Sequence, residues 1–198
     1  MTQTRAAAHG VSPIFVERWS PRAYDESILT ENDLKRLFEA AHWAPSAYNA
    51  QPWRFIYARR DTADWQRFVD LLVPGNRVWA QRASALVFAV SAQKFIPPGS
   101  AEAIDTGYSS YDTGAAVAYL ILQASLAGLA AHVVGGFDRQ AAQRVLAIPD
   151  GFRLESAIVI GRHSADAALS PELRAREAPN ERRPIESLIA EGRFDFQG

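Results

Sequence analysis

The sequence is organised around one stretch, Ala44-Pro45-Ser46-Ala47-Tyr48-Asn49-Ala50-Gln51-Pro52-Trp53. This stretch carries no charge, yet it holds two prolines and three short polar side chains, a pattern typical of neither an amphipathic helix nor an alternating strand. Pro45 disfavours the α conformation at Ala44, so a preceding helix must end there. We therefore predict a loop over residues 44–53.

Both ends of this loop are expected to be anchored in the core. Apolar residues repeat at helical spacing from Leu34 to Ala41 before it, and an apolar strand is predicted over residues 54–59 after it. A fixed, neutral, proline-stiffened loop suits a polar planar ligand. The alternative, that its serine, asparagine and glutamine side chains only satisfy the turn backbone, stays open at this point.

Length and composition bound the possible classes of protein. The 198 residues fit one domain, 1–198, and the net charge of −1 gives no field that would attract nucleic acid or an anionic membrane. The absence of cysteine excludes disulfides, thiolate metal sites, iron–sulfur clusters and a cysteine nucleophile. Because the first ten residues lack the apolar core of a signal peptide, we expect a cytoplasmic location.

The remaining chain reads as alternating helices and strands. Ser12-Pro13 predicts a short helix that ends near Ser20-Pro21, and Thr30 with Asp33 predicts the start of the helix before the loop. Further helices are expected over 65–72, stopped by Pro74-Gly75, and over 76–81 and 138–147, with strands over 85–91 and 154–161. The pattern lapses over 93–111, where we expect a lid or a disordered insert.

A long uncharged run separates Asp112 from Asp138. A transmembrane helix is rejected here, because polar residues interrupt the run, Gly128 stands where a helix would end, and 130–134 has strand character. A helix over 112–127 that is apolar on every side must be buried on every side. It therefore lies either at the centre of a large core or across a subunit contact.

Several common catalytic and binding motifs are missing. The four histidines have no metal-ligand spacing and are interpreted as surface or capping residues, and neither a hydrolase elbow, a dinucleotide fingerprint nor a P-loop occurs. What remains is a segment with arginines and a hydroxyl at Arg18, Ser20 and Arg22, the neutral loop, Gly135-Gly136, and Arg182-Arg183. These groups offer cations for a phosphate and hydrogen-bonding partners for an uncharged heterocycle, as flavin mononucleotide (FMN) requires.

At this point the chain resembles the FMN-dependent nitroreductases. Five landmarks carry the resemblance, in the same order as in that family: Arg18-Trp19-Ser20-Pro21-Arg22, the loop at 44–53, the run from Asp112 through Gly114 to Gly128-Leu129, Val134-Gly135-Gly136-Phe137-Asp138, and Arg182-Arg183-Pro184-Ile185-Glu186. The loop is the most specific of them. The resemblance spans nearly the whole chain.

The resemblance implies an α+β fold with a mixed, mainly antiparallel sheet surrounded by helices, in a homodimer of the domain-swapped kind. It implies that residues 172–198 pack on the partner subunit. Residues 93–111, with Phe95, Tyr108 and Tyr111, are expected to form a lid over the acceptor, and a surface loop with aromatic anchors stays open as the alternative. Each FMN would be bound by both subunits. The cofactor-binding residues that it implies are Arg18, Trp19, Ser20, Arg22, Pro45, Ser46, Ala47, Asn49, Asn76, Val134, Gly135, Gly136 and Arg182.

The same resemblance assigns a role to most of these residues. Arg18, Ser20 and Arg22 would approach the phosphate and the pyrimidine edge, with Arg182 assisting at the phosphate. Pro45, Ser46 and Asn49 would come from the partner, Asn76 would contact the pyrimidine, and the N–H of Gly135 would face flavin N5. Two departures bear on these assignments: Trp19 replaces a smaller or basic residue, and the family varies in spacing around Arg182.

The activity implied is reduction of nitroaromatics, quinones or related electrophiles. NADH or NADPH would pass a hydride to flavin N5 and the acceptor would then bind in the same place, with no catalytic acid or base from the protein. Two alternatives stay open: a specialised member that reduces an enone or consumes its own flavin, and a flavin-binding protein without turnover.

Overall fold

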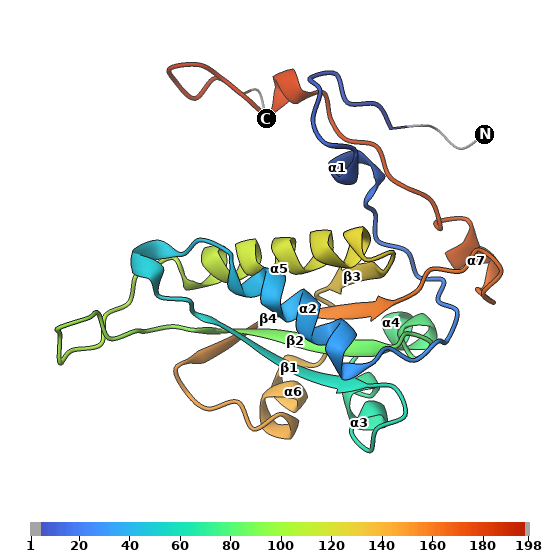
Figure 1. Cartoon of the computed structure of the whole chain (residues 1–198), viewed down its shortest axis with the longest axis horizontal. Helices are drawn as coiled ribbons and strands as arrows, with labels where there is room; N and C mark the ends of the chain where they lie inside the picture. Colours follow the sequence, from blue (N-terminus) through green and yellow to red (C-terminus); the bar gives the residue numbers. More distant parts are fainter. Residues whose placement is uncertain (1–4, 197–198) are drawn as a thin grey trace.

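The fold is built on a four-stranded sheet, and the computed structural model describes residues 5–196 of the expected domain, with residues 1–4 and 197–198 outside the described part. The strands are β1 (Trp53–Arg59), β2 (Ala85–Ala92), β3 (Ala130–Val134) and β4 (Phe152–Gly161), in the order β1-β2-β4-β3. Every pairing in it is antiparallel (Figure 1). The predicted α+β class is confirmed, but within residues 5–196 the sheet has no parallel pairing, so the predicted mixed sheet is fully antiparallel there.

Strand β2 shows why the sheet is covered on both faces. Its side chains alternate between two separate core clusters, with Leu86, Phe88 and Val90 in one and Val87 and Ala89 in the other. An antiparallel strand with one wet face would alternate apolar and polar residues, whereas β2 is apolar on both faces. The continuous apolar run that predicted a central strand therefore reflects two layers of helices around the sheet.

Helices α2 (Glu31–His42) and α5 (Ser109–Leu126) cover one face of the sheet. The predicted capping box of α2 is present, because Asp33 N donates to Thr30 Oγ1 at 3.1 Å and Thr30 N donates to Asp33 Oδ2 at 3.0 Å. Helix α5 begins three residues before the predicted start, and Gly128, with φ +69°, follows its end as predicted.

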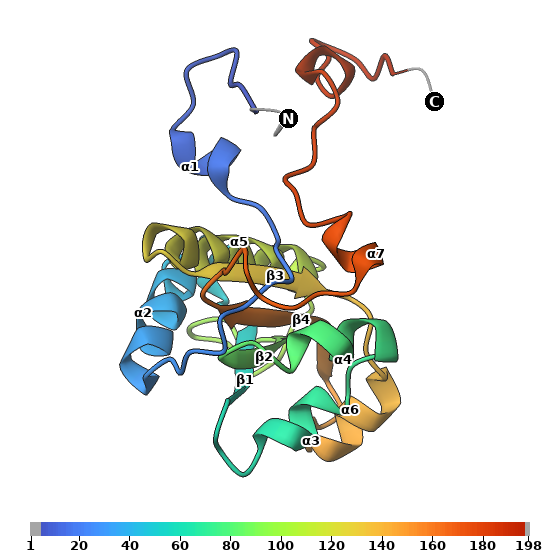
Figure 2. The same cartoon turned by 90° about the vertical axis from the view of Figure 1, so that its right-hand side faces the viewer.

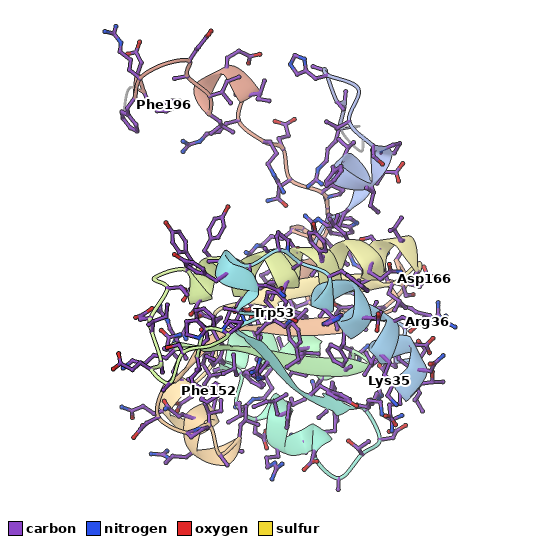
Figure 3. The ribbon with its side chains drawn as sticks, turned by 60° about the vertical axis from the view of Figure 1, so that its left-hand side comes forward. Lys35, Arg36, Trp53, Phe152, Asp166 and Phe196 are labelled. Carbon is purple, nitrogen blue, oxygen red and sulfur yellow. The ribbon has the colours of Figure 1, made fainter. Side chains whose placement is uncertain are left out.

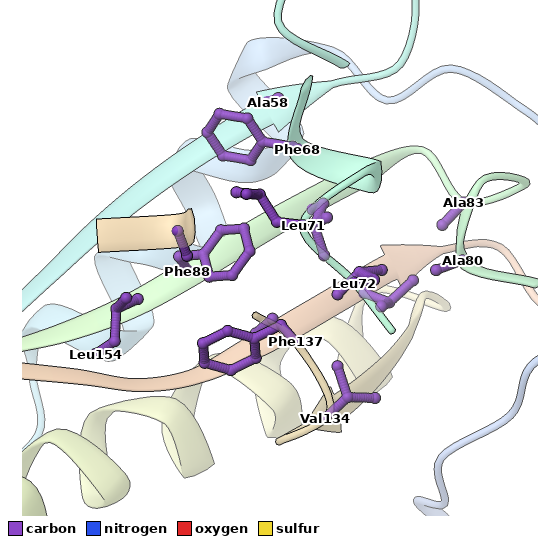
Figure 4. Packing of buried hydrophobic residues seen from close by; sticks show 14 of the residues in the cluster. Ala58, Phe68, Leu71, Leu72, Ala80, Ala83, Phe88, Val134, Phe137 and Leu154 are labelled. Carbon is purple, nitrogen blue, oxygen red and sulfur yellow. The ribbon is translucent and has the colours of Figure 1, made fainter. Parts of the chain in front are cut away.

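Helices α3 (Trp65–Val69), α4 (Pro74–Ala80) and α6 (Arg139–Val145) cover the opposite face. Phe88 packs edge-on against Phe68 and Phe137, with ring centroids 5.7 and 5.3 Å apart (Figure 4). The helix predicted over 65–72 already ends at Val69, so Pro74 does not stop it, and the helix predicted over 76–81 begins two residues earlier, at Pro74. Pro74 opens α4, because the first turn of a helix needs no N–H from that position.

Both terminal segments extend away from this body on the side of α5 (Figures 1 and 2). The N-terminal segment contains α1 (Pro13–Glu17), which ends before the predicted Ser20-Pro21 because Arg18 is already extended. The C-terminal segment contains α7 (Pro171–Arg174) and the 3-10 turn η2 (Ile185–Ser187). Residues 181–195 are exposed along their whole length.

The segment 93–111 has defined structure, so the disordered-insert alternative is wrong. Phe95 and Ile104 exchange two backbone hydrogen bonds of 3.0 and 2.9 Å, and the Phe95 ring stacks on Tyr48 of the loop at 6.1 Å. Its role as a lid stays a prediction. Within residues 5–196 no helix has both the length and the apolar character that crossing a bilayer demands.

Candidate functional site

The loop before β1 holds an unusual backbone. It contains the 3-10 turn η1 (Ala47–Asn49), and Tyr48, Asn49 and Gln51 have φ angles of 55°, 53° and 46°. Non-glycine residues in the left-handed region are uncommon, and they persist where the surrounding structure holds them, often at binding sites. Three of them within four positions mark this loop as a candidate site.

A buried carboxylate on α5 holds the loop in place. Asp112 is 4% exposed and its Oδ2 accepts a hydrogen bond from Ala47 N at 3.0 Å. Ser46 Oγ accepts from Gln51 N at 3.0 Å, and Gln51 Nε2 donates to Asn49 O at 3.0 Å. Ser46 and Gln51 therefore satisfy the turn backbone, as the simpler interpretation holds, while Pro45 and Asn49 stay exposed for a ligand.

A second group of polar residues gathers around the extended segment after α1. Arg18 Nη1 lies 3.5 Å from Ser20 Oγ, and Arg5 Nη1 donates to the carbonyls of Val16 and Arg18 at 3.1 and 2.9 Å. Burial, then the charges of Arg182 and Arg5, lower the pKa of the Arg18 guanidinium. Three guanidinium groups thus lie close enough to repel one another. Sequence analysis missed Arg5, because no motif surrounds it.

The guanidinium group of Arg22 lies over the ring of Trp79, which packs against His132. Its guanidinium carbon is 6.0 Å from the centroid of Trp79, and Trp79 lies 4.8 Å from the ring of His132. Burial, then the charge of Arg176, lower the pKa of Arg22. His132 is buried and its Nδ1 is 2.9 Å from Pro21 O, so its interpretation as a surface or capping residue is wrong.

These cations lack acidic partners in the part of the chain that the structure describes. No ion pair joins Arg5, Arg18, Arg22 or Arg182 to a carboxylate, whereas several arginines elsewhere are paired. Guanidinium groups that form no ion pair keep their N–H donors available for an anion such as phosphate. The donor set therefore fits the phosphate end of FMN.

The C-terminal segment brings Arg182 to the same place. A cavity of about 590 Å³ lies between the two terminal segments, with Arg5, Arg182 and Arg183 and also Glu181 and Glu186 in its lining. Arg182 Nη1 donates only to nearby carbonyls, those of Asn180 and Glu181 at 3.3 and 3.0 Å. Figure 3 shows the end of this segment, with Phe196, standing off from the body that holds Trp53.

Trp19 points to a different neighbour. Its ring meets His163 edge-on at 5.4 Å, and His163 Nε2 lies 3.7 Å from Glu177. Trp19, Arg18 and His163 also line a cavity of about 210 Å³ with Ser125 and Gly128, at the end of α5. The arginine segment is therefore packed against the C-terminal end of that helix.

The Gly135-Gly136 turn joins Asn76 at the end of β3. Asn76 Nδ2 donates to Gly136 O at 3.1 Å, and a Cβ on Gly136 would lie 2.7 Å from that nitrogen. A Cβ on Gly135 would meet nothing within 4 Å. The structure thus joins the predicted residues Asn76, Val134, Gly135 and Gly136, with the Asn76 amide holding the turn and the Gly135 backbone open to approach.

The loop and the arginine segment lie at opposite ends of α5 within one chain. Ala47 is bonded to Asp112 in the first turn, whereas Arg18 lines the same cavity as Ser125 of the last turn. At 1.5 Å per residue these turns are about 20 Å apart along the helix axis. One chain therefore does not bring the predicted neutral and cationic residues together.

Comparisons with known proteins show what this chain is similar to. The sequence model of the nitroreductase family matches residues 15–78 and 70–162. An uncharacterized 15.4 kDa protein of Mycolicibacterium smegmatis is 35% identical over 71% of this chain and 97% of its own length. An NADH dehydrogenase of Thermus thermophilus is 24% identical over 88% of this chain and 92% of its own.

A solved structure is similar over the full length of both chains. It is a crystal structure of an oxidoreductase containing FMN, with 42% identity, a TM-score of 0.94 and 100% coverage of each chain. Because the family model and this structure match most of the chain, including the loop, α5 and the Gly135-Gly136 turn, the protein belongs to the nitroreductase family.

Proposed function

We propose that this protein is an FMN-dependent oxidoreductase that uses NADH or NADPH to reduce nitroaromatics, quinones or related electrophiles. The observation that carries the proposal is the set of guanidinium groups at Arg18, Arg22 and Arg182, which form no ion pair within residues 5–196, together with a neutral loop whose backbone is left-handed at three residues. The 42% identical oxidoreductase that contains FMN and the NADH dehydrogenase relative support the cofactor and the reductant.

The site residues divide according to the two ends of FMN. Arg18, Ser20, Arg22 and Arg182 would bind the phosphate and the pyrimidine edge. The neutral groups of the loop and the open backbone of Gly135 would hold the uncharged ring. Trp19, with its ring against His163, and Ala47, bonded to Asp112, would shape these two groups rather than donate to the ligand.

Bound FMN supplies the hydride chemistry at N5, in alternation between the nicotinamide and the electrophile. The protein's residues bind, orient and shield. A cation near the pyrimidine edge stabilises the negative charge of the reduced ring. The proposal assigns no catalytic acid or base, and it keeps residues 93–111 as a lid over the acceptor.

A homodimer would join the two groups of residues. The side of α5 away from the sheet is apolar and exposed, with Tyr111 78%, Tyr119 42% and Leu126 69% exposed and with Gly114 and Ala118 between them. The predicted burial on every side therefore requires a second copy. Two antiparallel α5 helices would set the loop of one subunit beside the arginines of the other, and residues 172–198 would pack on the partner.

The test is a flavin spectrum followed by turnover. Purified protein is expected to carry or accept FMN, to bleach when NADH or NADPH is added under argon, and to recover its colour when a nitroaromatic or a quinone is added. Flavin that is bound but stays oxidised with both reductants would support a non-catalytic flavin-binding protein. Protein that refuses FMN would contradict the proposal altogether.

A further inference from the structure

Glu177, in the C-terminal segment just after α7, has the most heavily bonded carboxylate on the arginine side of the molecule. Its side chain is 4% exposed. Arg22 N donates to both oxygens at 2.8 and 3.0 Å, and Ala23 N donates to Oε1 at 2.8 Å. His163 Nε2 lies 3.7 Å from the same Oε1. No motif in the sequence marks this residue, which lies beyond the residues that the family model matches.

These bonds act on backbone rather than on side chains. A buried carboxylate is stable only when its oxygens are well bonded, and bonds from N–H groups to a charged acceptor are about twice as strong as neutral ones. Glu177 therefore holds two consecutive residues, Arg22 and Ala23, which lie 155 and 154 positions away in the sequence.

Other bonds hold the residues around this point. Pro21 O lies 2.9 Å from His132 Nδ1 and accepts from Tyr24 Oη at 3.3 Å. Ala23 O accepts from Ser164 N at 3.1 Å, and Asp25 N donates to Arg162 O at 3.1 Å. The bonds from Arg22 N and Ala23 N differ from these others, because their acceptor, Glu177, belongs to the C-terminal segment after α7.

The bonds to Glu177 influence the positions of the guanidinium groups. Arg22 carries one of them directly, and Arg18 and Ser20 precede it by four and two residues in an extended segment whose own helix has already ended. Five residues beyond Glu177 the same carboxylate-anchored chain supplies Arg182, whose charge acts on Arg5 and Arg18. Glu177 thus links the segment that carries Arg18 and Arg22 to the segment that carries Arg182.

We propose that Glu177 is a positioning residue for phosphate recognition: its carboxylate joins the C-terminal segment to Arg22 and Ala23 and so sets the spacing of the guanidinium groups that bind the flavin phosphate. This inference rests on the proposed function. Glu177 touches no part of the ligand in it and acts only through the backbone of the arginine segment.

The experiment compares two ligands that differ only in the phosphate. Full-length protein freed of flavin is titrated with FMN and with riboflavin, as wild type, as Glu177→Gln and as the matched control Glu172→Gln, an exposed glutamate of α7. Glu177→Gln keeps the shape of the side chain but sets an NH2 group against a backbone N–H. We expect FMN binding to weaken by about ten- to a hundredfold and riboflavin binding by less than about threefold.

A second measurement does not depend on flavin. In Glu177→Gln without ligand, the amides of Arg22 and Ala23 should exchange their hydrogens faster, while those of Glu172→Gln keep the wild-type rate. Equal weakening of both ligands in a folded variant would overturn the inference, because it would indicate a general structural role. Unchanged FMN binding would overturn it too.

Two further outcomes separate this inference from the proposed function. If Glu177→Gln does not fold, Glu177→Asp, which keeps the charge and shortens the side chain, must show the same loss of preference for FMN over riboflavin, or the inference fails. If wild-type protein binds FMN no better than riboflavin, the phosphate site itself is refuted and the inference falls with it. A wild-type preference that survives in the variants refutes the inference alone.

Discussion

The two ends of α5 carry two halves of a site that are built alike and differ in charge. At the first turn Asp112 accepts an N–H from the loop, and near the last turn Glu177 accepts N–H groups from the arginine segment. Both acids are buried: Asp112 is 4% exposed as a residue, and the side chain of Glu177 is 4% exposed. One half presents neutral groups on a left-handed backbone, and the other presents unpaired cations.

This difference is what a ligand with an uncharged planar ring and a terminal phosphate requires. Because the halves stand about 20 Å apart along one helix, neither is a complete site within one chain. The comparison therefore predicts separate effects: changes at the neutral end should weaken FMN and riboflavin alike, and changes at the cationic end should weaken FMN, which carries the phosphate, more than riboflavin.

The largest effect is expected from separating the subunits. Ala118→Arg puts a charge in the middle of the exposed apolar side of α5, where two copies would repel each other, so the proposed dimer should dissociate and FMN affinity should fall by more than about a hundredfold. Light scattering after size exclusion and an FMN titration check this. The control is Gln140→Arg, which adds the same charge at an exposed position of α6. A monomer with wild-type FMN affinity would contradict the shared site.

A smaller loss is expected at the cationic end. Arg18→Gln removes one guanidinium from the cationic end, so FMN should bind about thirtyfold more weakly while riboflavin, which lacks the phosphate, should weaken much less. The charge-matched control is Arg36→Gln, which lies exposed on α2. Titration at two salt concentrations should show a reduced salt dependence in the Arg18 variant. An equal loss of affinity for FMN and riboflavin would contradict phosphate binding at this end of α5.

The neutral end should respond in the opposite manner. Asp112→Ala leaves the N–H of Ala47 without its acceptor and releases the strained loop, so FMN and riboflavin should both bind about tenfold more weakly. Asp166→Ala, an exposed acid, serves as the control. A loss confined to FMN would show that the loop does not hold the ring.

Substitutions of the two adjacent glycines after β3 should have different effects, one on the stability of the fold and the other on FMN binding. Gly136→Ala would push a methyl to 2.7 Å from Asn76 Nδ2 and 3.0 Å from Val73 Cγ2, so unfolding in urea should show a loss of about 1–3 kcal/mol. Gly135→Ala meets no atom of the chain, so its stability should stay within about 0.5 kcal/mol while FMN binding weakens. If Gly135→Ala bound FMN as tightly as wild type, Gly135 would not be part of the FMN site.

The smallest effect is a dependence of stability on pH. Burial, and then the charges of Arg22 and Arg18, lower the pKa of the His132 imidazole, although Pro21 O and Glu177 favour its charged form. A lowered pKa in the folded state means that the unfolded chain binds the proton more readily. The contribution is therefore present above pH of about 6.5 and lost as the pH falls toward the folded pKa.

Melting temperatures at pH 8 and pH 5 test this contribution. The decrease between the two should be smaller in His132→Gln, which can still donate to Pro21 O, than in wild type or in His163→Gln. An equal decrease in all three would show that His132 does not contribute to it.

Much of the fold could be predicted because local rules decide it. The apolar run of β2, the capping box at Thr30 and Asp33, and the cap at Asp138 depend on residues a few positions apart. The prediction at Pro74 is wrong because a proline can follow the end of one helix or open the next, and only the packing of α4 decides between them.

The candidate site was predicted in part. The loop, the arginine segment and the Gly135-Gly136 turn are visible as motifs, and the structure joins Asn76 to Gly136. Arg5, Glu177 and the anchoring role of Asp112 could not be found, because each depends on a bond to a residue between 11 and 155 positions away. The burial of His132 likewise depends on Trp79 and Pro21.

The sequence by itself determined the elements, the neutral loop and the presence of arginines around a hydroxyl, because sterics and hydrophobic periodicity act over neighbouring residues. Only the tertiary structure decided that these groups stand at opposite ends of α5, that two buried carboxylates hold them, and that one side of the helix stays exposed. Those properties follow from how distant segments fill space and satisfy one another's backbone, and no local pattern specifies that.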